Sequence, residues 1–254
     1  MARSFDSLVE EAEAVSVDGW DFAWLDGRAT EERPSWGYQR LLRERLAAAT
    51  AALDIQTGGG EVLAGVGAEN LPPTMVATEG WPPNVARATA LLHPLGAVVV
   101  ADLDEPPLPF ADTAFDLVVS RHPATVHWSE IARVLTPAGT YFAQHVGSGA
   151  NVEISEHFLG PLEPGDRRHH DVEAEAARAA GLEVVACRNE RLRLAFFDVG
   201  AVVYFLRKVI WTVPDFTVDR FRDRLRLLHD EIEHDGVFHS TTSRTMFEAR
   251  KPSA

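Results

Sequence analysis

Acidic side chains close three successive apolar runs of this sequence, and their placement suits the binding of a nucleoside. Asp54 closes the first run, Glu79 the second and Asp102 the third. In an open parallel sheet, ligands bind beyond the carboxyl ends of the strands. A carboxylate after the second strand can accept both hydroxyls of a ribose, and one after the third can accept an adenine amino group. We therefore expect a nucleoside pocket at this edge of a sheet.

A glycine-rich turn follows the first acidic residue and leads into a helix-compatible segment. Three consecutive glycines, 58–60, come directly after Thr57. Glycines let the backbone approach a ligand closely, and the N–H groups of a helix start favour anionic or polar groups. A dinucleotide-binding fingerprint that began at Gly58 would need glycine or alanine at position 63, where Leu63 stands. An oxidoreductase is therefore not expected.

Short apolar runs alternate with helical patterns around these residues. The predicted strands are 51–55, 74–78, 97–101, 115–120 and 140–146, and the predicted helices are 61–68, 83–92 and 128–135. Continuous apolar strands that alternate with helices are typical of a parallel sheet covered on both faces. The predicted fold is α/β, a doubly wound, mostly parallel, seven-stranded Rossmann-like sheet. We expect residues 237–250 to form an antiparallel strand at its edge.

Two regions flank this alternation, and the predicted domain boundary lies at residue 50. Residues 1–50 hold a short acidic helix, an aromatic segment and a second helix. Trp36 and Tyr38 are candidates for a lid over a ligand. Aromatic side chains that only cover the core would give the same pattern. Residues 51–254 form the main domain. Its cofactor half is 51–146, and the substrate-side elements occupy 147–254, with helices at 172–180, 197–210 and 217–233 and a strand at 182–188.

Composition narrows the class of protein. The 254 residues carry 38 acidic against 24 basic side chains, a formal net charge of −14. Nucleic-acid binders usually present a basic surface, so nucleic acid is the less favoured partner and a small molecule the more favoured one. A homodimer stays open as an alternative.

Cellular location follows from what the chain contains. No run approaches the roughly 18 apolar residues of a membrane span, and the N-terminus lacks an apolar signal core, so we expect a cytoplasmic protein that does not enter a membrane. The single cysteine, Cys187, allows no internal disulfide. His169, His170 and Asp171 could bind a metal, but adjacent histidines in an acidic loop are usually only solvated. The histidines at 229, 234 and 239 do not share one helical face, so no metal is expected.

Between Ala51 and Val146 the sequence resembles the class I S-adenosylmethionine-dependent methyltransferases. The run L-D-I-Q-T-G-G-G is similar to the D-x-G-x-G-x-G turn of that family, L-P-F-A-D-T-A-F-D-L-V-V-S to its fourth-strand region, and R-V-L-T-P-A-G-T to its turn before the fifth strand. Two departures stand out, because Gln56 and Ala138 each occupy a glycine position of these motifs.

The resemblance implies S-adenosylmethionine as the cofactor and assigns roles to individual residues. Asp54 would lie near the methionine portion, Glu79 would bind the ribose, and Asp102 with Leu103 would contact the adenine. The cofactor-binding residues that we expect are Asp54, Gln56, Thr57, Gly58, Gly60, Glu79, Gly80, Asp102, Leu103 and Ser120.

The methyl acceptor should approach beyond the fourth strand. Methyl transfer from a sulfonium is an in-line displacement that mainly needs positioning, with a base only where the acceptor must lose a proton early. His122 is the candidate base or orienting group, and Arg121 could bind an anionic acceptor; loop residues with local hydrogen bonds are the plainer interpretation of both.

The function that the sequence favours is methyl transfer from S-adenosylmethionine to an unidentified small molecule. One alternative is an RNA enzyme, since the plan of the chain is faintly similar to the ribosomal guanine-N1 methyltransferases, whose cysteine-rich zinc module is absent here. Another is a non-catalytic protein that keeps the fold and binds the cofactor, an interpretation that Gln56 supports.

Overall fold

The computed structural model describes residues 3–17, 22–163, 165 and 168–253, which divide into two units. Unit 1 comprises residues 1–33, 149–165 and 191–243, and unit 2 comprises residues 34–148, 166–190 and 244–254. Residues 18–21, which belong to the predicted aromatic segment, lie outside the described ranges. The predicted domain boundary at residue 50 stays a prediction.

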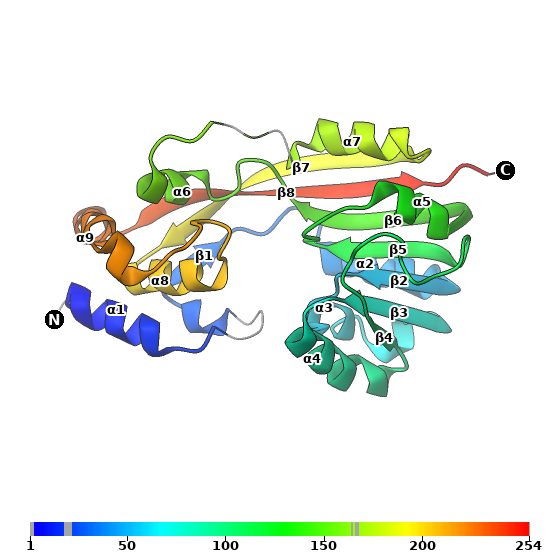
Figure 1. Cartoon of the computed structure of the whole chain (residues 1–254), viewed down its shortest axis with the longest axis horizontal. Coiled ribbons are helices and arrows are strands. Elements are labelled where there is room, and N and C mark those ends of the chain that lie inside the picture. Colours follow the sequence, from blue (N-terminus) through cyan, green and yellow to red (C-terminus); the bar gives the residue numbers. More distant parts are fainter. Residues whose placement is uncertain (1–2, 18–21, 164, 166–167, 254) are drawn as a thin grey trace. The chain divides into compact units, whose positions relative to one another are not determined.

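Unit 2 is built on parallel strands, labelled in Figure 1. These strands are β2 Ala51–Ile55, β3 Thr74–Glu79, β4 Val98–Ala101, β5 Phe115–Arg121 and β6 Leu135–Val146. They are ordered β6-β5-β2-β3-β4, and each neighbouring pair is parallel. Consecutive side chains face opposite sides, because Ala52 belongs to one apolar cluster and Leu53 to the other. The α/β, doubly wound class predicted from the sequence is confirmed.

Helices cover both faces of this sheet. The helices of unit 2 are α2 Tyr38–Ala48, α3 Glu61–Ala64, α4 Pro82–Leu92, α5 Trp128–Val134 and α7 His170–Ala179. Apolar residues of α2, α3 and α4 pack against one face, and those of α5 and α7 pack against the other. Two buried layers therefore hold the strand ends in place from both sides.

The last strand corrects one expectation. Strand β8, Phe238–Arg250, is antiparallel to β6 as predicted, but it lies between β6 and β7, Glu183–Phe196, and not at an edge. The buried polar side chains of this strand are small hydroxyls that can hydrogen-bond internally, namely those of Ser240, Thr242, Ser243 and Thr245. Thr245 Oγ1, for example, accepts from Asn189 Nδ2 at 3.0 Å.

The described chain forms eight strands and not seven. The additional one is β1, Ala29–Glu31, which pairs antiparallel with β7 at the end of the order β1-β7-β8-β6-β5-β2-β3-β4. Three residues are too few to show a strand's alternation in the sequence. Strands β7 and β8, the long yellow and red arrows of Figure 1, each contribute residues to both units.

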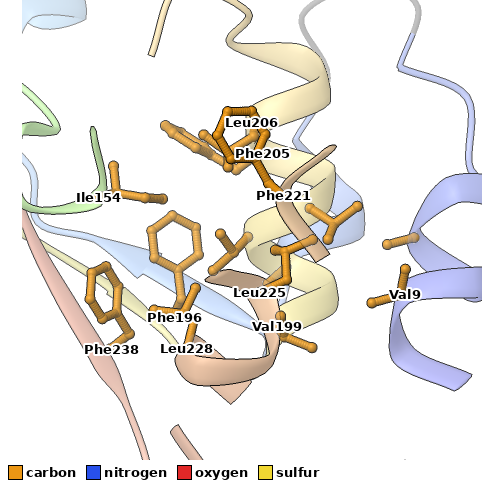
Figure 2. Packing of buried hydrophobic residues seen from close by; sticks show 14 of the residues in the cluster. Val9, Ile154, Phe196, Val199, Phe205, Leu206, Phe221, Leu225, Leu228 and Phe238 are labelled. Carbon is orange, nitrogen blue, oxygen red and sulfur yellow. The ribbon is translucent and has the colours of Figure 1, made fainter. Parts of the chain in front are cut away.

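Unit 1 has its own apolar core. Its helices are α1 Phe5–Ala14, α6 Val152–Leu159, α8 Val199–Lys208 and α9 Val218–Asp235. Helix α8 is apolar on almost all sides and is buried, as predicted. Figure 2 shows Phe196 of β7 among side chains of α9 and β8, and its ring centroid lies 5.3 Å from that of Phe205. This core does not include the residues predicted to bind a cofactor.

Two helical segments differ from their predicted ranges. Helix α3 ends at Ala64 and not at residue 68, because Gly65 and Gly67 follow at once. Helix α6 forms within residues 147–165, where the glycine-, proline- and acid-containing sequence predicts a loop with one helical turn. Within the described ranges, no helix has both the length and the apolar character that crossing a bilayer requires.

Candidate functional site

The turn after β2 bends through three left-handed residues within five positions. The φ angles are 59° at Gln56, 65° at Gly58 and 83° at Gly60. The Thr57 N–H donates to the Thr78 carbonyl at 2.9 Å, which ties the turn to the end of β3. A Cβ on Gly60 would lie 2.9 Å from Leu92 Cγ of α4. Conformation and close packing together require glycine at this position.

Gln56 adopts the left-handed conformation that its glycine position in the motif calls for. Its side chain turns to the loop after β5, where Nε2 donates to the Thr125 carbonyl at 2.9 Å and Oε1 accepts from the Ala124 N–H. Left-handed backbone is unfavourable by about 1–2 kcal/mol for a residue with a Cβ, and these two hydrogen bonds offset that strain. Gln56 therefore joins the glycine-rich turn to the loop after β5.

The three acidic residues lie at one edge of the sheet, as predicted. Asp54 is in register with Ala77 of β3, and Glu79 is in register with Ala101 of β4. The Asp102 N–H donates to the Glu79 carbonyl at 3.0 Å. Because the strands are parallel, their carboxyl ends bring the three side chains to the same edge.

Two of these carboxylates already accept hydrogen bonds from the turn and its surroundings. Glu79 accepts from the backbone N–H groups of Gly58 at 2.8 Å and Trp81 at 3.0 Å, one at each oxygen. Asp54 Oδ2 accepts from Thr57 Oγ1 at 2.7 Å. A carboxylate oxygen can accept more than one hydrogen bond, so Glu79 keeps capacity for a ligand.

Two other carboxylate oxygens lack a partner. Asp102 Oδ2 and Asp104 Oδ1 are buried, and neither has a hydrogen-bond donor among the described residues. Buried polar atoms in native proteins are nearly always paired, so each of these oxygens indicates a group that the protein chain itself does not supply. Asp104 was not among the residues predicted from the sequence.

The local electrostatics favour a ligand with positive charge. Burial raises the pKa of Asp54 to about 7, and the neighbouring charge of Glu79 acts in the same direction. Burial likewise raises the pKa of Asp104 to about 7, with Asp102 and Glu79 adding to it. The negative charges of these neighbouring carboxylates repel one another, and a bound cation would relieve this repulsion.

The segment after β3 lies very close to the segment after β4. A Cβ on Gly80 would lie 2.9 Å from the carbonyl oxygen of Asp102, so only glycine fits without movement. Leu103, the other predicted residue here, is 76% exposed. Its contact with the adenine stays a prediction.

The candidate acceptor residues lie at the end of β5, and His122 is held in one tautomer. The Trp36 indole N–H, which can only donate, bonds to Gln144 Oε1 at 2.9 Å. This fixes the Gln144 amide so that its Nε2 donates to His122 Nε2 at 3.0 Å. The accepting His122 Nε2 therefore carries no proton, and the ring proton resides on Nδ1.

The charge state of His122 agrees with this geometry. Burial lowers its pKa well below the ordinary value, and the charges of Arg121 and Arg244 act in the same direction. A neutral imidazole whose Nε2 lone pair is occupied can donate from Nδ1 but has no free basic nitrogen. Of the two roles predicted for His122, the orienting role fits this arrangement.

Trp36 and Tyr38 are placed in the core of unit 2. They are 6% and 8% exposed, Tyr38 stacks on Phe142, and its hydroxyl donates to the Ser120 carbonyl at 3.0 Å. Both side chains therefore position the end of β5 and its loop. Their contact with a substrate stays a prediction.

Replacing Trp36 with phenylalanine should release the tautomer of His122. The Gln144 amide oxygen loses its donor, at about 1–3 kcal/mol, and the amide becomes free to turn. Nitrogen-15 NMR of labelled histidine should show the Nδ1–H form in the wild type and a mixture of both tautomers in Trp36→Phe. Trp24→Phe in unit 1 is the matched control. An Nε2–H form in the wild type would contradict the assignment.

Several polar residues near the site were missed from the sequence. Tyr141, His145 and Glu173 form a buried network behind Ser120, and the half-buried Arg168 joins it through Glu173. One signal was available, because His145 stands inside a predicted, otherwise largely apolar strand. Glu173 and Arg168 gave none, since helix α7 reads as an ordinary alanine-rich helix.

A group of possible metal ligands lies at the start of α7. His169, His170 and Asp171 place one ligand atom each within 4.8 Å of one another. His169 Nδ1, however, accepts from the Asp171 N–H as the cap of the helix. The Nδ1 lone pair of His169 is thus used in capping the helix.

Residues 53–143 match the family model described as a methyltransferase domain. A search of curated proteins finds no match. The matched range spans β2 to β6 and includes every acidic residue of the site. It confirms the resemblance to class I methyltransferases over that part of the chain.

Solved structures share the fold at low identity. A proposed methyltransferase of Bacillus halodurans is 19% identical, with a TM-score of 0.56, over 84% of this chain and 98% of its own. The [4+2]-cyclase SpnF is 18% identical, with a TM-score of 0.55, over 97% and 93%. Phosphoethanolamine N-methyltransferase 2 of Haemonchus contortus, solved with phosphomonomethylethanolamine and S-adenosylhomocysteine, is 16% identical, with a TM-score of 0.54, over 99% and 61%. At these identities the likeness concerns the fold alone.

Proposed function

We propose that this chain is an S-adenosylmethionine-dependent methyltransferase that acts on a small-molecule acceptor. One observation carries the proposal: Asp54, Glu79 and Asp102 lie at the carboxyl ends of three adjacent parallel strands, beside a glycine-rich turn. The methyltransferase-domain match over residues 53–143 supports methyl transfer as the type of reaction.

The polar groups of the site fit this cofactor. Glu79 would accept the ribose hydroxyls, and the unpaired Asp102 Oδ2 would accept from the adenine amino group. The raised pKa values of Asp54 and Asp104 suit a ligand that carries positive charge, as the sulfonium and ammonium groups do. Gly58 and Gly60 would let the turn approach the ligand closely.

The residues of the chain position the acceptor. When bound, S-adenosylmethionine supplies a methyl group on a cationic sulfur. His122, neutral and protonated at Nδ1, would donate a hydrogen bond to the acceptor, and Arg121 would attract an anionic part of it. Positioning is the main requirement of an in-line displacement.

Asp102→Ala is expected to weaken the binding of S-adenosylhomocysteine about 10- to 100-fold, since one hydrogen bond to a charged acceptor is lost. Calorimetry measures this directly. Glu105→Ala removes the same charge from the same loop and should change the affinity by less than about threefold, as expected for an exposed charge. Absence of binding by the wild type would overturn the cofactor assignment.

The acceptor class is tested with radiolabelled cofactor. We expect methyl transfer into a metabolite extract and not into total RNA, because the net charge of −14 opposes a polyanion. Label in RNA would favour the ribosomal guanine-N1 alternative.

A second candidate, binding of the cofactor without methyl transfer, is favoured by Gln56. Its Cβ and left-handed backbone occupy a glycine position of the turn. Binding of S-adenosylhomocysteine together with no transfer to either pool would support this candidate over the enzyme.

A further inference from the structure

A continuous chain of hydrogen bonds runs from the end of β5 into the interior of unit 2. Ser120 Oγ lies 2.9 Å from the Tyr141 hydroxyl, which lies 2.9 Å from His145 Nε2. His145 Nδ1 lies 2.7 Å from Glu173 Oε2. All four residues are buried, and His145 is 0% exposed. Nothing in the proposed cofactor site requires His145 or Glu173.

The donors and acceptors of this chain can have only one direction when His145 is neutral. The Glu173 carboxylate accepts, so His145 Nδ1 carries the proton and its Nε2 lone pair faces Tyr141. The Tyr141 hydroxyl therefore donates to His145, and its oxygen accepts from the Ser120 hydroxyl. The Ser120 hydroxyl proton is then engaged in the hydrogen bond to Tyr141. Ser120 Oγ can therefore only accept a further hydrogen bond.

Ser120 and Tyr141 also line a small cavity at the ligand edge of the sheet. The other lining residues include Ile55, Asp104 and His127. The cavity volume is about 10 Å³, room for about one water molecule or one small polar group. The acceptor end of the chain thus faces a cavity, and its other end is a buried carboxylate.

Charged and aromatic groups surround His145 and Glu173. Arg168 Nη1 lies 3.4 Å from Glu173 Oε1, and its Nη2 donates to the carbonyls of Pro123 and Ala124 in the loop after β5. Phe247 stacks on the His145 ring from β8, at 5.8 Å between centroids. The charged or titratable groups around His145 are thus Glu173 and Arg168, with Tyr141 on its own strand and His122 from β5.

We propose that Ser120 is a catalytic residue that removes a proton from the methyl acceptor, and that Tyr141, His145 and Glu173 are positioning residues that draw this proton inward. As the bond between the methyl carbon and the acceptor atom forms, the acceptor O–H or N–H bond breaks. Its proton goes to Ser120 Oγ, the Ser120 proton goes to Tyr141, and the Tyr141 proton goes to His145 Nε2.

The resulting imidazolium is balanced by the Glu173 carboxylate. After the product leaves, the proton returns along the same chain to water in the cavity. The inference rests on the proposed function and narrows it, because the acceptor must be an alcohol, a phenol or an amine that loses a proton on methylation. Burial keeps the pKa of Tyr141 well above its ordinary value, so Tyr141 conducts the proton without becoming an anion.

Tyr141→Phe tests the relay with little change in packing. With an extract that supports wild-type transfer, kcat should fall about 100-fold in Tyr141→Phe and in Ser120→Ala, the effect typical of losing a general base. In Tyr141→Phe the KM for S-adenosylmethionine and the affinity for S-adenosylhomocysteine should stay within threefold of the wild-type values, as for any loss confined to the transition state. Ser155→Ala, a buried serine of unit 1, should keep the wild-type kcat.

A spectroscopic readout is independent of activity. Nitrogen-15 NMR should show His145 protonated at Nδ1 in the wild type and in Ser120→Ala. An Nε2–H tautomer would overturn the direction of the chain, and an unchanged kcat in Tyr141→Phe would overturn the relay while leaving the proposed function intact. No transfer by the wild type to any acceptor would overturn the proposed function and the catalytic role together.

Discussion

Replacing Asp54 with asparagine is expected to stabilise the protein at pH 8 by about 3 kcal/mol and to weaken its binding of S-adenosylmethionine. Asp54 is 8% exposed, and burial raises its pKa from 3.8 to about 7. A rise of this size corresponds to roughly 4 kcal/mol of unfavourable free energy once the carboxyl group is ionised. Asparagine keeps an acceptor for Thr57 Oγ1 and removes the charge.

The sign of the pH dependence follows from the raised pKa. Between pH 3.8 and about 7 the folded protein binds more protons at Asp54 than the unfolded chain does. This contribution to stability is therefore fully present below pH 3.8 and is lost as the pH rises through about 7. In Asp54→Asn this part of the pH dependence should disappear.

Urea unfolding at pH 4 and at pH 8 measures the effect, and Glu44→Gln is the matched control. Glu44 is an exposed carboxylate of α2, so its replacement should change the free energy of unfolding by less than about 0.5 kcal/mol. Loss of cofactor affinity together with gain of stability would identify Asp54 as a residue kept for binding. Destabilisation of Asp54→Asn at pH 8 would contradict the prediction.

Gly60→Ala is expected to destabilise the protein by about 3 kcal/mol. A left-handed backbone is unfavourable for alanine by about 1–2 kcal/mol, and overpacking against a buried side chain adds about 1–3 kcal/mol. The new Cβ would lie 2.9 Å from Leu92 Cγ and 3.3 Å from Ala88 Cα. Both neighbours belong to α4 and are buried, so they have little room to move.

Gly96→Ala separates the two contributions to this loss. Gly96 has a φ of 87°, almost the same as Gly60, but a Cβ there would meet nothing within 4 Å. Gly96→Ala should therefore lower the free energy of unfolding only by the conformational contribution, about 1–2 kcal/mol. Equal losses of unfolding free energy in the two variants would show that the contact with Leu92 has no effect.

Strand ends could be predicted from the sequence because their signals are local. Asp54, Glu79 and Asp102 each close a short apolar run, and parallel strands bring such ends to one edge. The glycine-rich turn is equally local, since its positive φ angles belong to residues adjacent in sequence. This part of the site needs no knowledge of distant contacts.

Partners far apart in sequence could not be predicted. The tautomer of His122 depends on a hydrogen bond between Trp36 and Gln144, which are 108 residues apart. Glu173 reaches His145 from a helix 28 positions later, and nothing in its alanine-rich surroundings marks it as a partner. Such pairs depend on how helices pack on the sheet, and packing is not encoded in any short pattern.

Strand β8 was misplaced for a related reason. Its serines and threonines are small enough to be buried once they are hydrogen-bonded. Whether a polar strand lies at an edge depends on the strands beside it, and here β7 and β6 cover both sides.

Gln56 links two loops that the family pattern, with glycine at this position, would leave independent. Its side chain accepts from the Ala124 N–H and donates to the Thr125 carbonyl, while its own backbone belongs to the glycine-rich turn. Neither loop can open alone without breaking hydrogen bonds of the other. These hydrogen bonds therefore couple the two loops in local unfolding.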